Sequence, residues 1–292
     1  MATGQATNRT NVDLPVELSR EILQKARESS AIMQLAREIA LPGRGVAINV
    51  ITSDPEASWV GETSTKPVAN PGLATKVMRA YKLAVIVPFS NEFRRDLSAL
   101  YSALVERLPG ALAKKFDSTV FGNGDKPGDD FDNFAAITAQ SLASDVYQGL
   151  VAADTDVALH GGIINGYAIS PQMRGILLGA TDTTKRPLFN NNTGDGAVPY
   201  ILGAPTRVAK GAFKSGNPSI VGVAGDWSQA MWGSVEGVKI DFSSDATLDI
   251  DAEHKINLFQ QNMFAVRAEI EVGFRADTSV FNAFTATGVP SI

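Results

Sequence analysis

Hydrophobic residues near the start of the chain recur at helical spacing. Between Pro15 and about Ile39 they fall three or four residues apart, as on one face of an amphipathic helix, and Pro42-Gly43 ends the element. Residues 1–13 are small and polar, without periodicity, and are typical of a flexible arm. The pattern predicts an arm followed by a helix.

Two apolar runs then flank a long polar stretch. Residues 46–51 and 76–85 are predicted to be strands, with the turn-rich residues 61–72 between them. Because a polar loop of this length has little of its own to pack on, ordering it costs conformational entropy. We therefore expect this excursion to dock on something outside itself.

The clearest helix is predicted to begin at Ser90, an N-cap residue, and to carry an apolar stripe as far as Phe116. Pro109 falls inside it. Proline removes a backbone donor and clashes with the preceding turn, so a kink is expected near Leu108. The glycine-rich residues 122–128 end the helix and form a loop.

Alternating short strands and helices follow, which indicates a compact α/β lobe. The predicted elements are a strand at 163–169, a helix capped at Ser170 and running to Leu178, a strand at 220–224, a short helix capped at Asp226 and ending at Met231, and a strand at 238–242. Residues 264–275 then alternate apolar and polar side chains, which predicts a closing strand with one buried face.

Composition narrows the class of protein. The chain has 292 residues, 44% hydrophobic and 20% charged, enough for one large domain or two ordinary ones, and these fractions disfavour a disordered or coiled-coil chain. The longest apolar run, Leu83 to Phe89, is too short for a membrane helix, and the N-terminus lacks the apolar core of a secretory signal. The protein is therefore expected to be made and used in a cytoplasm, without a membrane partner.

Charge and cysteine content exclude several kinds of chemistry. With no cysteine, the chain has no disulfide, thiolate zinc site or cysteine nucleophile. A net charge of -5 argues against a surface that grips nucleic-acid phosphates. Nucleic acid near this protein would be contained and not held.

Catalytic motifs are scarce. His160 and His254 are the only imidazoles; His160 begins a His-Gly-Gly that faintly resembles an esterase oxyanion loop, but no Gly-x-Ser-x-Gly nucleophile motif is present. A hydrolase centred on His160 is therefore the weaker alternative. No cofactor is expected, and no metal site, because the acidic residues between Asp245 and Glu253 lack calcium-loop spacing.

The order of elements, together with four short motifs, resembles the major capsid proteins of tailed bacteriophages with the Hong Kong 97-type fold. The similarity covers nearly the whole chain from about Pro15. The motifs are Gly61-Glu62 through Lys66-Pro67, Val120 through Asp125, Gly225 through Ala230, and Asn262 through Glu269.

The resemblance implies an α+β fold with a peripheral domain built on a spine helix, an axial α/β domain, an N-terminal arm, and an extended loop that reaches over a neighbouring subunit. The expected segments are an arm and first helix at 1–45, the extended loop at 46–88, the spine helix of the peripheral domain at 89–126, the axial domain at 127–240, peripheral-domain strands at 241–275, and a C-terminal segment at 276–292.

It also implies a function. Hexamers and pentamers of the chain would tile the icosahedral head that encloses double-stranded phage DNA, so the protein is expected in the virion capsid after assembly in the host bacterial cytoplasm. Further partners implied are a portal protein and scaffold or decoration proteins. The type member carries an N-terminal scaffolding segment, whereas this chain reaches its first helix by Pro15; a separate scaffold, or none, is expected. An encapsulin-like compartment shell, which stores cargo enzymes, is the alternative with the same fold.

A covalent cross-link is the most specific implication. In the type member a loop lysine forms an isopeptide bond with an asparagine of another subunit, assisted by a glutamate, and the matching residues here are Lys66, Asn262 and Glu269. The carboxylate would take a proton from the lysine amine, which is nucleophilic only when neutral. The alternatives are that Lys66 is a solvated loop residue, Asn262 a strand-end cap, and Glu269 a partner of Arg267 or Arg275.

Overall fold

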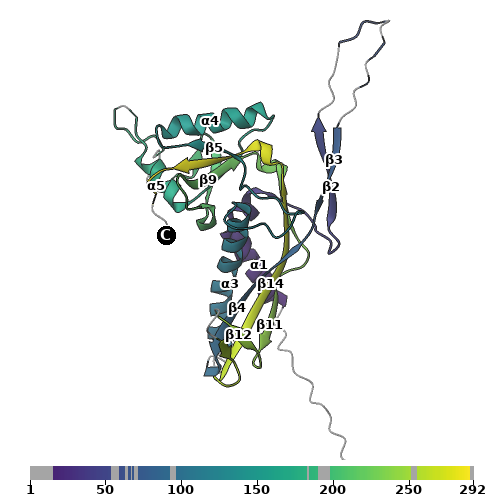
Figure 1. Cartoon of the computed structure of the whole chain (residues 1–292), viewed down its shortest axis with the longest axis vertical. Coiled ribbons are helices and arrows are strands. Elements are labelled where there is room, and N and C mark those ends of the chain that lie inside the picture. Colours follow the sequence, from purple (N-terminus) through teal and green to yellow (C-terminus); the bar gives the residue numbers. More distant parts are fainter. Residues whose placement is uncertain are drawn as a thin grey trace, which may run out of the picture.

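The computed structural model describes residues 16–53, 59–62, 65–66, 68, 72–92, 97–182, 184–189, 198–250 and 255–289. The predicted arm at 1–13 and His254 lie outside these residues. Figure 1 shows an elongated molecule with long strands and helices at one end, an α/β lobe at the other, and a two-stranded ribbon that projects from the body.

The long strands form a five-stranded sheet around β14 (Met263–Ala276). On one side β4 (Tyr81–Ser90) pairs with β14 in an antiparallel ladder. On the other side β11 (Lys239–Ser243) and then β10 (Ala230–Ser234) pair antiparallel with successive parts of β14. The short β1 (Arg37–Glu38) adds a parallel edge to β10. The closing strand predicted from alternating side chains is confirmed as the centre of this sheet.

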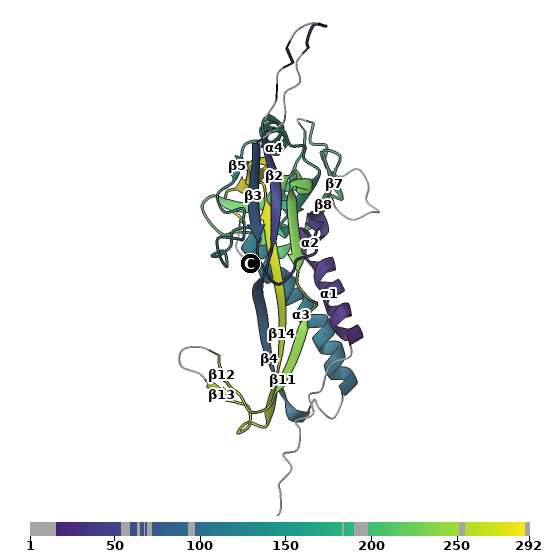
Figure 2. The same cartoon turned by 90° about the vertical axis from the view of Figure 1, so that its right-hand side faces the viewer.

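Two helices, α1 (Val16–Ser29) and α3 (Leu97–Val120), cover one face of this sheet, as Figure 2 shows. Their apolar positions pack on inward-facing residues of the strands, which removes that surface from water. The buried members of this core are Ile22, Leu108, Leu112, Val238, Phe264, Val266, Ala268 and Ile270.

The single helix predicted from Pro15 to Ile39 is wrong: α1 ends at Ser29 and a short α2 (Ala31–Leu35) follows. Ser30 causes the break, because its hydroxyl caps α2 by accepting a hydrogen bond from the Met33 amide at 3.1 Å. The same hydroxyl donates to the buried Asp117 carboxylate on α3.

Asp117 fixes this corner on the spine helix. Its second carboxylate oxygen accepts a hydrogen bond from the Ala31 amide at 3.0 Å. Burial raises the pKa of the carboxyl to about 6, although its hydrogen bonds with Ser30 and with the Ala31 and Ile32 backbone lower the pKa. A tertiary contact therefore divides a segment whose periodicity is continuous.

The spine helix agrees with its prediction at the C-terminal end but not at the predicted cap residue. Ser90 is the last residue of β4 and accepts a hydrogen bond from the Glu92 amide at 3.4 Å, while the described part of α3 begins at Leu97. The helix continues through Pro109 to Val120 and ends just before the glycine-rich residues 122–128, as predicted. The kink near Leu108 stays a prediction.

The α/β lobe contains a six-stranded sheet in the order β5-β15-β9-β6-β8-β7. Its strands are β5 (Thr138–Ser141), β6 (Gly166–Ile169), β7 (Tyr200–Ile201), β8 (Ala204–Val208), β9 (Ser219–Gly225) and β15 (Phe281–Ala286), and the helices α4 (Val146–Leu159) and α5 (Pro171–Gly179) pack on it.

Two local predictions in this lobe have different outcomes. Ser170 caps α5 with proline at its first position, as predicted. The short helix predicted to run from Asp226 to Met231 is wrong: Asp226 caps only a 3-10 turn at Trp227–Gln229, and β10 begins at Ala230. Pairing of Ala230 with β14 ends the turn, which is a tertiary effect.

The projecting ribbon pairs β2 (Val46–Ser53) with β3 (Gly72–Met78) in antiparallel register. The single strand predicted at 76–85 is wrong, because Arg79 and Ala80 separate β3 in the ribbon from β4 in the body sheet. A second, smaller hairpin joins β12 (Thr247–Asp249) and β13 (Lys255–Asn257) at the far end of the body.

Candidate functional site

Arg275 on β14 fixes the base of the ribbon, because its side chain forms hydrogen bonds with the ribbon and with the body. Its Nε donates to the Val77 carbonyl of β3 at 2.7 Å. Its Nη1 and Nη2 donate to Asp132 at 2.8 Å and Asp130 at 3.0 Å, in the loop after the spine helix. Hydrogen bonds between charged groups, such as these two, are stronger than neutral hydrogen bonds. Arg275 therefore joins the ribbon, the long strand and the loop.

The ribbon carries apolar side chains that its own chain leaves in water. Trp59 is 106% exposed and Val68 is 86% exposed, whereas Trp227 and Trp232 in the body are 2% and 1% exposed. Lys66 lies between these two ribbon residues in sequence and is exposed. Exposed apolar side chains grouped on a projection are typical of an interaction surface.

Asn262 lies in the turn just before β14. Its φ of 52° is in the left-handed region, which asparagine tolerates better than most residues. Asn91, directly after β4, donates its backbone amide to the Asn262 carbonyl at 3.0 Å and its side-chain Nδ2 to Asn262 Oδ1 at 2.8 Å. The nearby Phe259 is 79% exposed. Strand pairing begins at Met263, so the extended ladder does not reach Asn262.

Glu269 lies in the middle of β14, opposite Ala84 on one side and Lys239 on the other. Its side chain is 21% exposed, and its Oε1 is 3.4 Å from Arg267 Nε. The contact with Arg267 is one of the alternatives raised by the sequence, while none with Arg275 is recorded in the described part of the chain. In one subunit this carboxylate lies beside charged groups and not in an apolar pocket.

The three residues implied by the resemblance do not meet within one chain. A rise of about 3.3 Å per residue separates Asn262 and Glu269 by roughly 20 Å along the strand. Lys66 lies in the connection between the two strands of the ribbon, and Asn262 follows the β12–β13 hairpin in the chain. Figure 1 shows the ribbon and this hairpin at opposite ends of the molecule. Any bond between Lys66 and Asn262 must therefore join two subunits.

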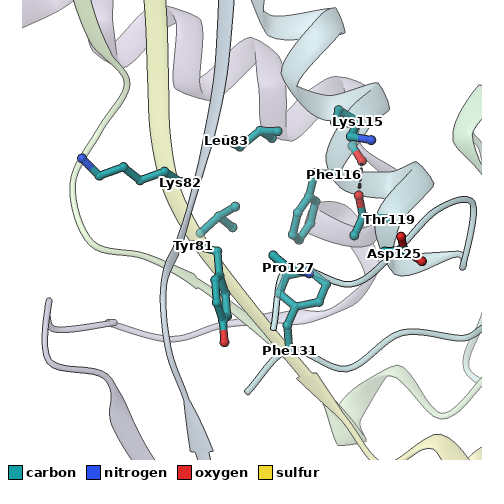
Figure 3. Close-up of a pocket in the computed structure, with 10 residues that line it drawn as sticks. Tyr81, Lys82, Leu83, Lys115, Phe116, Thr119, Asp125, Pro127 and Phe131 are labelled. Carbon is teal, nitrogen blue, oxygen red and sulfur yellow. Dashed lines mark hydrogen bonds between the residues drawn. The ribbon is translucent and has the colours of Figure 1, made fainter. Parts of the chain in front are cut away.

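A hollow of about 160 Å³ lies where β4 meets the end of the spine helix (Figure 3). Its floor is apolar, with Leu83, Phe116 and Phe131, and Lys82 and Lys115 lie at its edge. Thr119 donates its hydroxyl to the Lys115 carbonyl at 3.0 Å, a helix-internal bond. This lining holds no nucleophile with an adjacent base, so it gives no reason to assign chemistry.

The hydrolase alternative finds no support at His160. This residue is the exposed C-cap of α4, and its Nδ1 lies 2.8 Å from the Asp156 carbonyl, a local capping contact. Across the ranges that the structure describes, no group of three His, Asp or Glu side chains could hold a metal ion. Within those ranges, too, no helix is long and apolar enough to cross a bilayer.

Two residues with clear structural roles were missed from the sequence. The sequence analysis considers Arg275 only as a polar-face residue and as a partner of Glu269, and it does not single out Asn91. Their partners lie 143 to 198 and 171 residues away in the chain, and no local pattern carries such distances. For Arg275, the Asp-Asp-Phe-Asp run at 129–132 is a signal in the sequence, because clustered carboxylates in a loop indicate a cation nearby.

Comparison with known proteins gives a consistent result. The model of the phage capsid family matches residues 11–285. The "probable major capsid protein gp17" of Mycobacterium phage D29 is 27% identical over 290 residues, covering 93% of this chain and 89% of the relative. The "major capsid protein" of Staphylococcus phage 80alpha is 27% identical over 285 residues, covering 91% and 82%.

Solved structures show the same fold. A chain from Microbacterium phage Oxtober96 matches with a TM-score of 0.69 at 21% identity, covering 98% of this chain and 96% of that one. The capsid of a native GTA particle matches with a TM-score of 0.63 at 14% identity, covering 98% and 95%. These matches confirm the α+β fold of the Hong Kong 97 type. The family match and the capsid-protein relatives favour a phage capsid over the compartment shell. The chain belongs to the phage capsid family, whose members are structural proteins of the virion and not enzymes.

Proposed function

We propose that this phage capsid protein assembles as hexamers and pentamers into an icosahedral head around double-stranded DNA. The observation that carries the proposal is the ribbon: its base is fixed by Arg275, and it holds Trp59 and Val68 out in water. A buried aromatic side chain removes about 150–250 Å² of surface from water, which favours docking on a neighbouring subunit. Closed point-group symmetry then limits the assembly to a finite shell.

The net charge of -5 agrees with a shell that encloses DNA without binding it tightly. A wall that neutralised many phosphates would hold the genome in place, whereas a wall of the same charge sign lets it move. A portal protein and scaffold or decoration proteins are proposed as further partners by likeness to the family.

We further propose that Lys66 of one subunit forms an isopeptide bond with Asn262 of another, with Glu269 as the proton acceptor from a subunit other than the one that supplies Asn262. An exposed aromatic side chain is close in sequence to each end of the bond: Trp59 precedes Lys66 by seven residues, and Phe259 precedes Asn262 by three. Burial of such side chains between subunits would exclude water and lower the local dielectric, which favours the neutral, nucleophilic amine. The amine nitrogen bonds to the Asn262 side-chain carbon, and ammonia leaves.

Assembly is tested by sedimentation velocity of the purified native protein. Particles of megadalton mass are expected. A species of one or two chains that stays small after addition of a candidate scaffold contradicts the shell. If the particles hold a co-purifying enzyme in place of DNA when isolated from infected cells, the proposal that they enclose a genome is wrong.

The cross-link is tested by boiling assembled particles in denaturant and separating the chains on a gel. We expect a ladder of covalent multimers that is abolished by Lys66→Arg, which keeps the charge but removes the primary amine, and by Asn262→Asp. Matched controls are Lys25→Arg on α1 and Gln261→Glu next to Asn262, and both keep the ladder. A single monomer band from unaltered particles refutes the cross-link but leaves the shell intact.

A further inference from the structure

Asn91 holds the side chain of Asn262 in a defined orientation. The two residues are 171 positions apart, and their side-chain amides meet with Asn91 Nδ2 2.8 Å from Asn262 Oδ1. The backbone bond from the Asn91 amide to the Asn262 carbonyl, at 3.0 Å, fixes the same pair from the main chain. This double contact lies directly beyond the last pair of the β4–β14 ladder, Ser90 with Met263.

The direction of the side-chain hydrogen bond is the informative feature. Asn91 Nδ2 donates to Asn262 Oδ1. Asn91 Oδ1 is buried and has no hydrogen-bond partner among the described residues. An unpaired buried acceptor costs free energy, so this orientation is not explained by satisfying Asn91 itself. In this orientation Asn262 Oδ1 accepts the hydrogen bond. Among the described residues, no hydrogen bond donated by Asn262 Nδ2 is recorded.

A carboxamide is a poor electrophile, and its reaction with an amine places negative charge on the carbonyl oxygen. A donor already aimed at that oxygen stabilises the charge as it develops, which is the role of an oxyanion hole. We propose that Asn91 is a catalytic residue of the isopeptide reaction, polarising the Asn262 side-chain carbonyl and stabilising the tetrahedral intermediate. This inference rests on the proposed cross-link.

The reaction balances without any co-reactant. The Lys66 Nζ lone pair forms a bond with Asn262 Cγ, and the carbonyl electron pair moves to Oδ1, where Asn91 Nδ2 donates its hydrogen bond. When the carbonyl reforms, the Cγ–Nδ2 bond breaks. The proton lost by Nζ passes to the departing nitrogen through the Glu269 carboxylate of a subunit other than the one that supplies Asn262, and the nitrogen leaves as ammonia.

The test compares the rate of ladder formation in particles built from Asn91→Ala, Asn91→Asp and unaltered protein. Removing one donor of this kind costs about 100-fold to 1000-fold in rate in well-studied enzymes, and we expect a slowing of at least about 10-fold for Asn91→Ala. Asn91→Asp is expected to be slower still, because a carboxylate cannot donate and repels the forming oxyanion. A purely structural role predicts the reverse order, since aspartate keeps the size and shape of asparagine.

Glu92→Gln, on the next residue, is the matched control and is expected to cross-link at the unaltered rate. Only material that sediments as complete particles is compared, and Asn91→Leu, which is close to asparagine in size but has no donor, serves as a second donor-loss variant should Asn91→Ala fail to assemble. Equal rates for unaltered, Asn91→Ala and Asn91→Asp particles would overturn the role of Asn91 while leaving the cross-link standing. Absence of a ladder in unaltered particles would overturn both.

Discussion

Tryptophan is buried in the body of this protein and exposed on the ribbon. In the body, Trp227 is 2% exposed, donates its Nε1 to the Gly166 carbonyl at 2.9 Å and packs edge-on against Phe281. On the ribbon, Trp59 is 106% exposed. A tryptophan in water leaves a large apolar area unburied. The two side chains are chemically identical, so the difference in exposure comes from the packing around each one.

The difference separates stability within a subunit from contacts between subunits. The body contains two sheets that share aromatic packing: Phe274 of β14 contacts Phe134, and Phe134 stacks on Phe281 of the lobe at 4.7 Å. The ribbon is two strands wide, and a two-stranded hairpin is marginally stable alone. Substitutions in the body are therefore expected to lower the free energy of unfolding, and those on the ribbon to affect assembly.

The largest effect on subunit stability is expected from Trp227→Ala. The change leaves a cavity beside Phe134 and Phe281 and removes the donor to the Gly166 carbonyl. Truncations of this kind cost about 3–5 kcal/mol. Urea denaturation of dissociated subunits measures the loss. An unchanged unfolding midpoint would contradict the shared aromatic core.

A smaller loss is expected where the ribbon meets the body. Arg275 has an 11% exposed side chain, and Arg275→Ala removes the cation that pairs with Asp132 and one of the two that pair with Asp130, the other being Arg79 at 3.1 Å. We expect about 2–3 kcal/mol of destabilisation, because carboxylates left half-buried lose their compensation.

The matched control for this change is Arg267→Ala on the same strand. Its partner is Asp241 at 2.7 Å, and the Arg267 side chain is 47% exposed, so the loss is expected to be below about 1 kcal/mol. Hydrogen exchange in β3 reports ribbon mobility and should rise only for Arg275→Ala. Equal exchange in the two variants would remove Arg275 as the anchor of the ribbon.

Asp117 gives the stability of the body a dependence on pH. Burial raises its pKa to about 6 from 3.8. Between these two pH values the carboxyl is therefore mostly protonated in the folded state and mostly ionised in the unfolded chain. This carboxyl therefore stabilises the fold least above pH 6, and stability is lost as pH rises from about 4 to about 6, by an amount on the order of 2 kcal/mol. The comparison is the unfolding free energy of the unaltered protein minus that of Asp117→Asn at pH 4 and pH 7. A difference that stays constant with pH would contradict the assignment.

The smallest effect on subunit stability is expected from Trp59→Ala. Because this side chain is fully exposed in one subunit, the unfolding free energy should change by less than about 0.5 kcal/mol. Assembly should nevertheless fall, seen as a smaller fraction of megadalton particles in sedimentation velocity. Val68→Ala is the milder companion variant. Normal assembly of Trp59→Ala would show that the ribbon tryptophan is not part of the subunit interface.

Much of the architecture is predictable from local patterns. The alternation at 264–275 identifies β14, the stripe up to Phe116 identifies most of the spine helix, and Ser170-Pro171 identifies the start of α5. The motifs around Lys66 and Asn262 also led to the correct family. These features are local because side-chain periodicity and capping depend on residues a few positions apart.

The sequence by itself determined that this is an acidic, cysteine-free chain of the phage capsid family, with a polar, turn-rich stretch between two apolar runs. Only the tertiary structure decided where helices break and which side chains meet. Asp117 divides the first helix through Ser30, Arg275 joins β3 to a distant loop, and Asn91 orients Asn262. Each contact joins residues 86 or more positions apart, and such contacts depend on how the elements pack and not on the periodicity of any one of them.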